Sequence, residues 1–432
     1  MPTMPRKPLS IATRVWSLVG LTLAFLVATY LLLARDIPAF DDSDLALPER
    51  DIDPSRNPFP AIREISIHSD HADRIQTAWK GLQERGETDP SEIRRLVSEL
   101  SEPIDRFRTY SRSYPWQEDR EYSLGNTSPH WSSWLQIFQL LDLESENLRR
   151  SGEFGEAADL AFDQIGFGYG LMSSGPALVS LVLGAGLVQS AQNNLVHILT
   201  TAPPDSIETT GIEERLASLP SPSDLFQYNL KAEYAYQGRI LDELQQADIS
   251  NFGLIDSEIP TWLPSAILFQ RNRTQLLSAG IIRRALRESE LVSGTGMGTG
   301  PLPALPPMSR FPQNQFGRSW VEMTASSIDG IARRTSVLEA RSRMLSVLVA
   351  VLRWKKDHGA FPHGLGSLVP AYLPAIPLDP FDGELIRYDP ARRLIYSVGT
   401  DQADDGGVPP DKPGTLESQE EIVIELDPEK AP

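Results

Sequence analysis

The stretch that decides the fold of the C-terminal region reads Gly359-Ala-Phe-Pro-His-Gly364, Leu378-Asp-Pro-Phe-Asp-Gly383, Leu394-Ile-Tyr-Ser-Val-Gly-Thr-Asp401 and Asp404-Asp-Gly-Gly407. Glycine and proline mark a turn at each break, and short apolar runs stand between the turns. The preceding segment, 333–357, has a broad apolar stripe at helical spacing and ends at Gly359. Segments 386–388, 394–398 and 421–426 predict antiparallel strands, with Asp389-Pro-Ala-Arg392 as the first turn. We therefore expect a long helix followed by a small antiparallel sheet.

The order of these parts resembles the C-terminal head of the major pseudopilin of type II secretion systems. The shared parts are a helix, a Gly-x-Phe-Pro turn, a Leu-rich segment, Asp-Pro-aromatic-x-Gly, a strand ending in Tyr-Ser-x-Gly-x-Asp, and a Gly-Gly loop. The resemblance covers roughly residues 335–426. It implies a cell-envelope protein in which the sheet packs on the helix. Nothing around residues 6–10 fits a pilin leader, so the resemblance does not predict a polymerising pilin.

The resemblance also implies a calcium site in the loop 397–407. Calcium binds carboxylate and backbone carbonyl oxygens, which aspartates and glycines in one loop can supply. The implied ligands are Asp401, Asp404, Asp405 and Glu421, which precedes the last strand. Gln402 stands where the family usually has glycine, and the loop is about one residue longer. The alternative interpretation is a solvated acidic turn after a strand.

An apolar run near the N-terminus predicts a membrane anchor. Residues 16–33 carry no charge and are long enough to cross a bilayer as a helix. Basic residues precede the run and aspartates follow it, which favours a cytoplasmic N-terminus. A cleaved signal peptide is the competing reading, but the run is long for one and residues 30–35 lack a small-x-small cleavage site. We expect residues 15–34 to be an uncleaved single-pass anchor in the bacterial inner membrane, with the bulk of the chain periplasmic.

A second stretch without charges runs from 165 to 188. Several glycines and Pro176 interrupt it, and no basic cluster flanks it. We expect a buried helical hairpin here, with a second membrane segment as the alternative.

The composition limits the partners. The chain has 432 residues and a net charge of −18, so the bulk of it repels nucleic acid and anionic lipid. It has no cysteine, which excludes thiol catalysis, thiolate metal sites and disulfides. We expect an envelope protein partner and no nucleic acid.

The region 61–292 has apolar residues at helical spacing, as in Trp134, Ile137, Phe138 and Leu141. Residues 140–162 look like one tetratricopeptide-type helical hairpin, without a second copy at a fixed period. The expected fold class is thus mainly α: an N-terminal transmembrane helix, an α-helical bundle or irregular solenoid, and a small α+β pseudopilin-like domain.

Few residues in the helical region suggest chemistry. His68 and His71 are three apart and could form a metal pair or a plain surface feature. The polar segment 269–274 could cap a helix or line a binding groove. No Gly-x-Ser-x-Gly motif is present, and we assign no catalytic residue.

These patterns divide the chain into seven expected segments. They are a cytoplasmic N-terminus 1–14, a transmembrane helix 15–34, a linker 35–60, a periplasmic α-helical domain 61–292, a Gly/Pro-rich linker 293–318, a pseudopilin-like α+β domain 319–426 and a tail 427–432. The first functional hypothesis is a non-enzymatic, membrane-anchored periplasmic scaffold with a calcium-stabilised head, associated with a secretion or envelope assembly. The alternative is a periplasmic hydrolase with its site in the helical domain.

Overall fold

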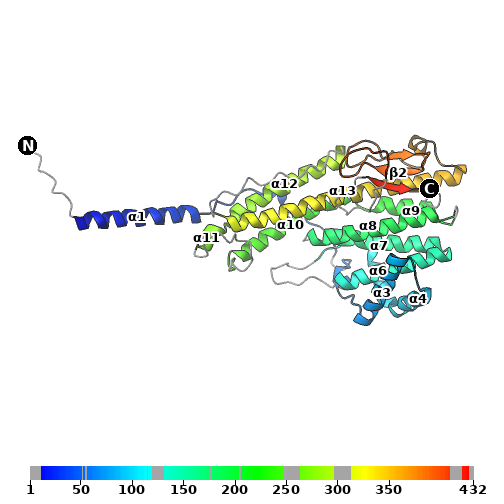
Figure 1. Ribbon diagram of the computed structural model, residues 1–432, viewed down its shortest axis with the longest axis horizontal. Coiled ribbons are helices and arrows are strands. Elements are labelled where there is room, and N and C mark those ends of the chain that lie inside the picture. Colours follow the sequence, from blue (N-terminus) through cyan, green and yellow to red (C-terminus); the bar gives the residue numbers. More distant parts are fainter. Residues whose placement is uncertain are drawn as a thin grey trace, which may run out of the picture. The chain divides into compact units, whose positions relative to one another are not determined.

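The computed structural model describes residues 11–50, 52–53, 56–113, 115–118, 131–175, 178–203, 206–247, 249, 263–295, 313–408 and 421–427. The expected mainly helical class is confirmed, with a small three-stranded antiparallel sheet near the C-terminus (Figure 1). The chain forms two compact units. The first comprises Met1–Ser43, Gln237–Ile281 and Pro303–Ser326, and the second Asp44–Tyr236, Ile282–Leu302 and Ser327–Pro432. The Gly/Pro-rich linker predicted at 293–318 lies mostly outside the described residues.

The helices of the second unit are α2 (Phe59–Arg63), α3 (Ser69–Arg85), α4 (Pro90–Glu99), α5 (Ser101–Ser111), α6 (Trp131–Ser151), α7 (Phe154–Ser174), α8 (Leu178–Thr201) and α9 (Thr209–Ser218). The first unit holds α1 (Ile11–Ala34) and α11 (Ser265–Leu268). Helices α10 (Pro222–Leu244), α12 (Arg271–Thr295) and α13 (Gln315–His358) have residues in both units.

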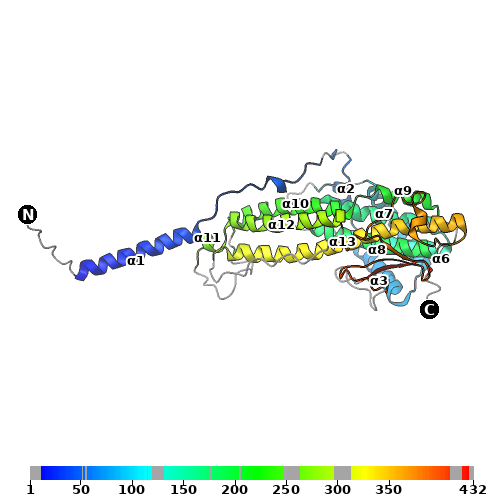
Figure 2. The same ribbon diagram turned by 90° about the horizontal axis from the view of Figure 1, so that it is seen from above.

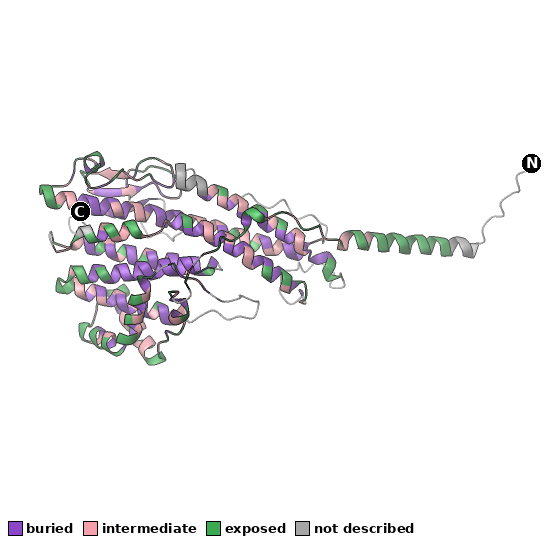
Figure 3. Ribbon diagram, turned by 180° about the vertical axis from the view of Figure 1, so that it is seen from behind, coloured by how far each residue is buried: buried purple, intermediate pink, exposed green. Residues whose placement is uncertain are grey.

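Helix α1 is the expected N-terminal apolar helix. Its segment Trp16–Ala34 is apolar and long enough to cross a membrane, and none of it is buried (Figure 3). It is the one helix with these properties among the described residues. Such a helix fits either a single membrane span or a signal sequence.

The charge-free stretch 165–188 forms a buried helical hairpin, as expected. It occupies the end of α7 and the start of α8, and α7 is buried throughout its C-terminal half (Figure 3). A Cβ at Gly184 would lie 2.5 Å from the carbonyl oxygen of Gly168, and one at Gly168 would lie 2.9 Å from the carbonyl of Gly184. The glycines therefore let two helix backbones approach closely.

The preceding turn also follows the sequence pattern. Helix α6 ends at Ser151, and α7 starts at Phe154. Gly152 lies between them with a φ of 84°, a left-handed conformation that glycine adopts without strain.

The C-terminal sheet has the order β1-β2-β3, with strands β1 (Arg387–Asp389), β2 (Leu394–Ser397) and β3 (Ile422–Glu425). Its register pairs Tyr388 with Ile395 and Ile395 with Ile424. The predicted turn is confirmed, since Oδ1 of Asp389 accepts the N–H groups of Ala391 and Arg392. The sheet lies beside the C-terminal part of α13 (Figure 1, Figure 2).

Helix α13 begins at Gln315, well before the predicted start at 333. Phe316, Val321, Ile328 and Ile331 are buried along its first half. The sequence-based prediction missed this part of the helix because the glycines and serines between these residues lower helix propensity, although the apolar residues keep helical spacing. Tertiary packing thus extends the helix.

Candidate functional site

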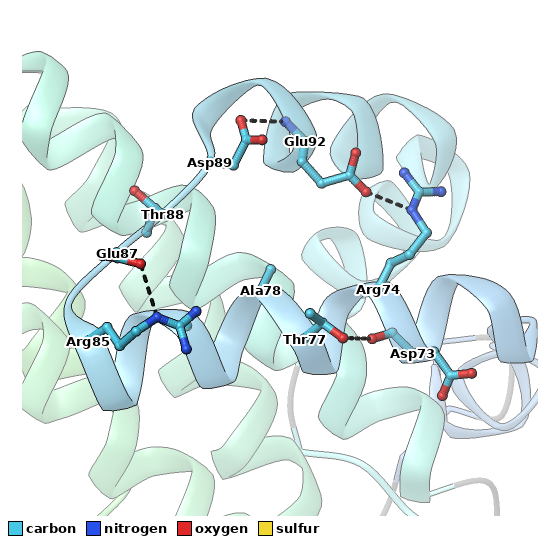
Figure 4. Close-up of a pocket in the computed structure, with 10 residues that line it drawn as sticks. Asp73, Arg74, Thr77, Ala78, Arg85, Glu87, Thr88, Asp89 and Glu92 are labelled. Atoms are coloured by element: carbon cyan, nitrogen blue, oxygen red, sulfur yellow. Dashed lines mark hydrogen bonds and ion pairs between the residues drawn. The ribbon is translucent and has the colours of Figure 1, made fainter.

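A groove of about 490 Å³, lined mostly by charged and polar residues, lies between α3 and α4 in the second unit (Figure 4). Helix α3 ends at Gly86, whose φ of 67° turns the chain. Asp89 then caps α4 by accepting the N–H groups of Ser91 and Glu92, and Pro90 occupies the first helical position. The groove is lined by Asp73, Arg74, Thr77, Ala78, Gly81, Arg85, Glu87, Thr88, Asp89 and Glu92.

Ion pairs join the two helices at this groove. The Nε of Arg74 on α3 lies 2.7 Å from Oε1 of Glu92 (Figure 4). Its Nη1 lies 2.7 Å from Oε2 of Glu99. Arg74 and Arg95 together lower the pKa of Glu99 to about 2. Glu99 therefore stays ionised near neutral pH and cannot serve there as a proton donor.

Both threonine hydroxyl groups of the groove have partners in the protein. Thr77 Oγ1 donates to the carbonyl of Asp73, and Thr88 Oγ1 accepts a hydrogen bond from Nη1 of Arg150 at 3.4 Å. Among the described residues that line the groove there is no histidine to activate a nucleophile. The arrangement suits recognition of a polar or charged partner segment.

His68 and His71 do not converge on a metal. His68 caps α3, while Nε2 of His71 lies 3.2 Å from Oε2 of Glu99. Within the part of the chain that the structure describes, no cluster of three or more His, Asp or Glu side chains could hold a metal ion. His71 thus belongs to the α3–α4 contact, while His68 stays exposed at the start of α3.

The structure brings Glu421 to the acidic loop, as the resemblance implied, but uses it differently. Its carboxylate is buried, and it accepts the N–H groups of Asp405 at 3.0 Å, Gly407 at 3.1 Å and Val408 at 2.5 Å. Oδ1 of Asp401 accepts the N–H of Ala403. In this arrangement both carboxylates accept backbone N–H groups. Calcium binding by this loop remains a prediction from the resemblance.

Asp404, another predicted calcium ligand, has hydrogen-bond partners within the head. Oδ2 of Asp404 lies 3.1 Å from Nε of Arg387, and Oδ1 accepts the N–H of Gly406. Arg387 and this amide hold the pKa of Asp404 below its usual range, against its partial desolvation. The ion pair with β1 would have to break before Asp404 could bind a cation.

Asp379 organises the head more than its sequence context suggested. The carboxylate is fully buried and accepts hydrogen bonds from Phe381 N–H, Ser397 Oγ, Val398 N–H and Arg387 Nη1. The turn expected in Leu378–Gly383 is present, with Oδ1 of Asp379 accepting the N–H of Phe381 and Gly383 at a φ of 78°. Burial raises the pKa of Asp379 despite these bonds. The long-range bonds to β1 and β2 could not be read from the sequence.

The polar segment 269–274 covers the link from α11 to α12 and the first four residues of α12. Asp36 caps this helix from a distance: Oδ2 accepts the N–H of Asn272 at 2.7 Å, and Oδ1 accepts that of Arg273 at 3.1 Å. Three of its residues, Phe269, Gln270 and Arg271, also line a pocket. The segment thus lies at a helix start, as one interpretation expected, but the side-chain cap comes from Asp36.

The chain matches no protein-family model, and comparison with curated proteins and with solved structures finds no similar protein.

Proposed function

We propose that the chain is a membrane-anchored scaffold or interaction protein of the cell envelope. The observation that carries this proposal is the attachment of α1 to the first unit. The carbonyl oxygen of Leu33 accepts two hydrogen bonds, from Nε2 of Gln270 at 2.6 Å and from Nε2 of Gln313 at 3.0 Å. Asp36, two residues beyond α1, caps α12.

These bonds favour a retained anchor over a cleaved signal. A signal peptide is removed from the mature protein, so contacts to its C-terminal end would be lost after cleavage. Here the last turn of the apolar helix supplies an acceptor to two side chains of the folded unit. Asp36 also gives α12 the charged cap that a helix N-terminus favours. Such an attachment would hold the first unit at the membrane surface, next to the end of α1.

The pseudopilin-like head is part of the proposal. Its support is the long helix α13 followed by the Asp-Pro-Phe-Asp-Gly turn and the three antiparallel strands. Nη1 of Arg343 on α13 donates to the carbonyl of Leu378 at 2.7 Å, which ties the turn to the helix. A head of this kind and a polar groove would give a scaffold two surfaces for partners in an envelope assembly.

The absence of cysteine makes a clean topology test possible. Single cysteines are introduced as Ser10→Cys and, on the exposed side of α4, as Ser98→Cys. An impermeant maleimide should label Ser98→Cys once the outer membrane is permeabilised, and Ser10→Cys only after lysis. Intact-mass analysis should find residues 1–34 on the mature chain. A mature N-terminus beyond residue 34 would refute the anchor.

The interaction part is tested with a cross-linker in intact cells. Glu87→Cys places the reagent in the α3–α4 groove, and Ser98→Cys, outside the groove lining, is the matched control. We expect a specific heavier adduct from Glu87→Cys alone. Identical adducts from both positions, or none from either, would count against the groove as a docking surface.

A further inference from the structure

A second pocket lies in the first unit, beside the end of the proposed anchor. Its volume is about 360 Å³. Ala34 and Asp36 line it from the α1 side. The rest of the lining comes from the end of α10 and the residues after it, from α11 and from the start of α12: Leu244, Gln245, Ala247, Ile249, Ser265, Ala266, Phe269, Gln270 and Arg271. Helix α1 packs against α11 within this unit.

The position of this pocket corresponds to the headgroup layer of a membrane. Ala34 is the last residue of the apolar segment that would span the bilayer. One extended residue adds roughly 3.3 Å, so Asp36 lies within about 7 Å of the apolar end. The polar layer on each side of a bilayer is roughly 5–7 Å thick. A pocket lined by Ala34 and Asp36 therefore faces lipid headgroups if α1 spans the membrane.

Gln270 gives this pocket an acceptor that needs a partner. Its side chain is 2% exposed, and Nε2 donates to the carbonyl of Leu33, which fixes the orientation of the amide. Its other end, Oε1, is buried and has no hydrogen-bond partner among the described residues. A buried acceptor of this kind is stabilised by an N–H or O–H donor.

Charge around the pocket is of both signs. Asp36 adds a carboxylate whose oxygens accept backbone N–H groups of α12. Arg271 adds a guanidinium whose Nε is paired with Oδ1 of Asp242 at 2.8 Å and whose Nη1 lies 3.4 Å from Oδ1 of Asn272. A guanidinium has five N–H donors, so further donors remain for a phosphate.

We propose that this pocket binds the headgroup of a zwitterionic phospholipid with a primary ammonium, of the ethanolamine type. The ammonium donates to Oε1 of Gln270 and to Asp36, and the phosphate meets Arg271. Leu244 and Phe269 supply apolar surface for the glycerol and upper acyl region. The net charge of −18 disfavours an anionic lipid.

This inference rests on the proposed membrane anchor, but its test does not. The full chain is purified in detergent with α1 present, and lipid retention is measured by native mass spectrometry against equal amounts of ethanolamine, choline and glycerol phospholipids. We expect the ethanolamine lipid to be retained about tenfold over the choline lipid, because the quaternary ammonium has no N–H donor. Equal retention of all three would mean nonspecific lipid only and would overturn the proposal.

Variants assign the preference to the pocket. Gln270→Met removes the acceptor at similar volume, and Arg271→Met removes the phosphate partner. The matched control is Arg287→Met, an exposed arginine further along α12. We expect the preference to fall to near unity in Gln270→Met, total phospholipid retention to fall in Arg271→Met, and neither to change in the control. Circular dichroism establishes that the variants fold.

A preference unchanged in both pocket variants would refute the assignment. If soluble phosphoethanolamine binds as tightly as the lipid, the pocket binds a soluble ligand, and the proposal of a phospholipid site is overturned. Loss of α1 in the mature chain would refute the anchor alone, since this measurement keeps α1 in place.

Discussion

Removal of the Glu421 carboxylate should loosen the loop that follows β2. Glu421 is 3% exposed and accepts three backbone N–H groups, from Asp405, Gly407 and Val408. A hydrogen bond to a charged group contributes about 1.5–3 kcal/mol. The three bonds share one carboxylate, and the part-buried N–H of Asp405 can regain water. We therefore expect Glu421→Ala to cost about 3 kcal/mol of local stability.

Hydrogen exchange read by mass spectrometry measures this loss in the full chain. A cost of about 3 kcal/mol lowers protection by roughly 100-fold in the segments 394–408 and 421–427. Glu425→Ala is the control, because it removes the same charge from β3, the strand that Glu421 precedes, without touching these three bonds. Protection should stay near wild type in the control and in the α7–α8 hairpin of both variants.

Calcium and a chelator separate the two roles considered for Glu421. If the carboxylate acts through backbone amides, Glu421→Ala lowers protection equally in both conditions. If Glu421 is a calcium ligand, as the pseudopilin resemblance implies, the loss appears only when calcium is present. The second outcome, or unchanged protection in Glu421→Ala, would refute the reasoning from these contacts.

Two further predictions concern the helical core. Gly184→Ala should destabilise the fold by about 1–3 kcal/mol in a thermal melt, because its Cβ would lie 2.5 Å from the carbonyl oxygen of Gly168. The control Gly186→Ala has nothing within 4 Å of its Cβ among the described residues, so it should be neutral or slightly stabilising in the same measurement. Burial raises the pKa of Asp142 to about 7 even though Gln164 donates to it, so the folded chain keeps a proton that the unfolded chain releases near pH 4. The contribution of Asp142 to the free energy of unfolding is thus largest at acidic pH and falls as pH rises from about 4 to about 7. In urea denaturation, the free energy of unfolding of Asp142→Asn should gain up to about 4 kcal/mol on that of wild type between pH 4 and pH 8. A difference that stays constant over this range would show that Asp142 is ionised in the fold.

The fold was largely readable from local patterns. The apolar run of α1, the turn at Gly152, the Asp389 turn and the strands of the head all depend on residues within a few positions of one another. The start of α13 was misjudged because apolar contacts, and not propensity, hold its first half in a helix. Backbone preference acts over one or two turns, so it predicts elements better than their ends.

The partners of the site residues, in contrast, depended mostly on long-range packing. The sequence by itself determined that an apolar run long enough to span a membrane lies near the N-terminus and that segment 269–274 is polar. The approach of Glu421 to the acidic loop was implied only by the pseudopilin resemblance. Only the tertiary structure decided that Glu421 bonds to backbone amides, and that Asp36 caps a helix that begins more than 230 residues later. The physical reason is that hydrogen-bond partners of buried polar groups are chosen by long-range packing. A local pattern names the donor or acceptor and leaves its partner undefined.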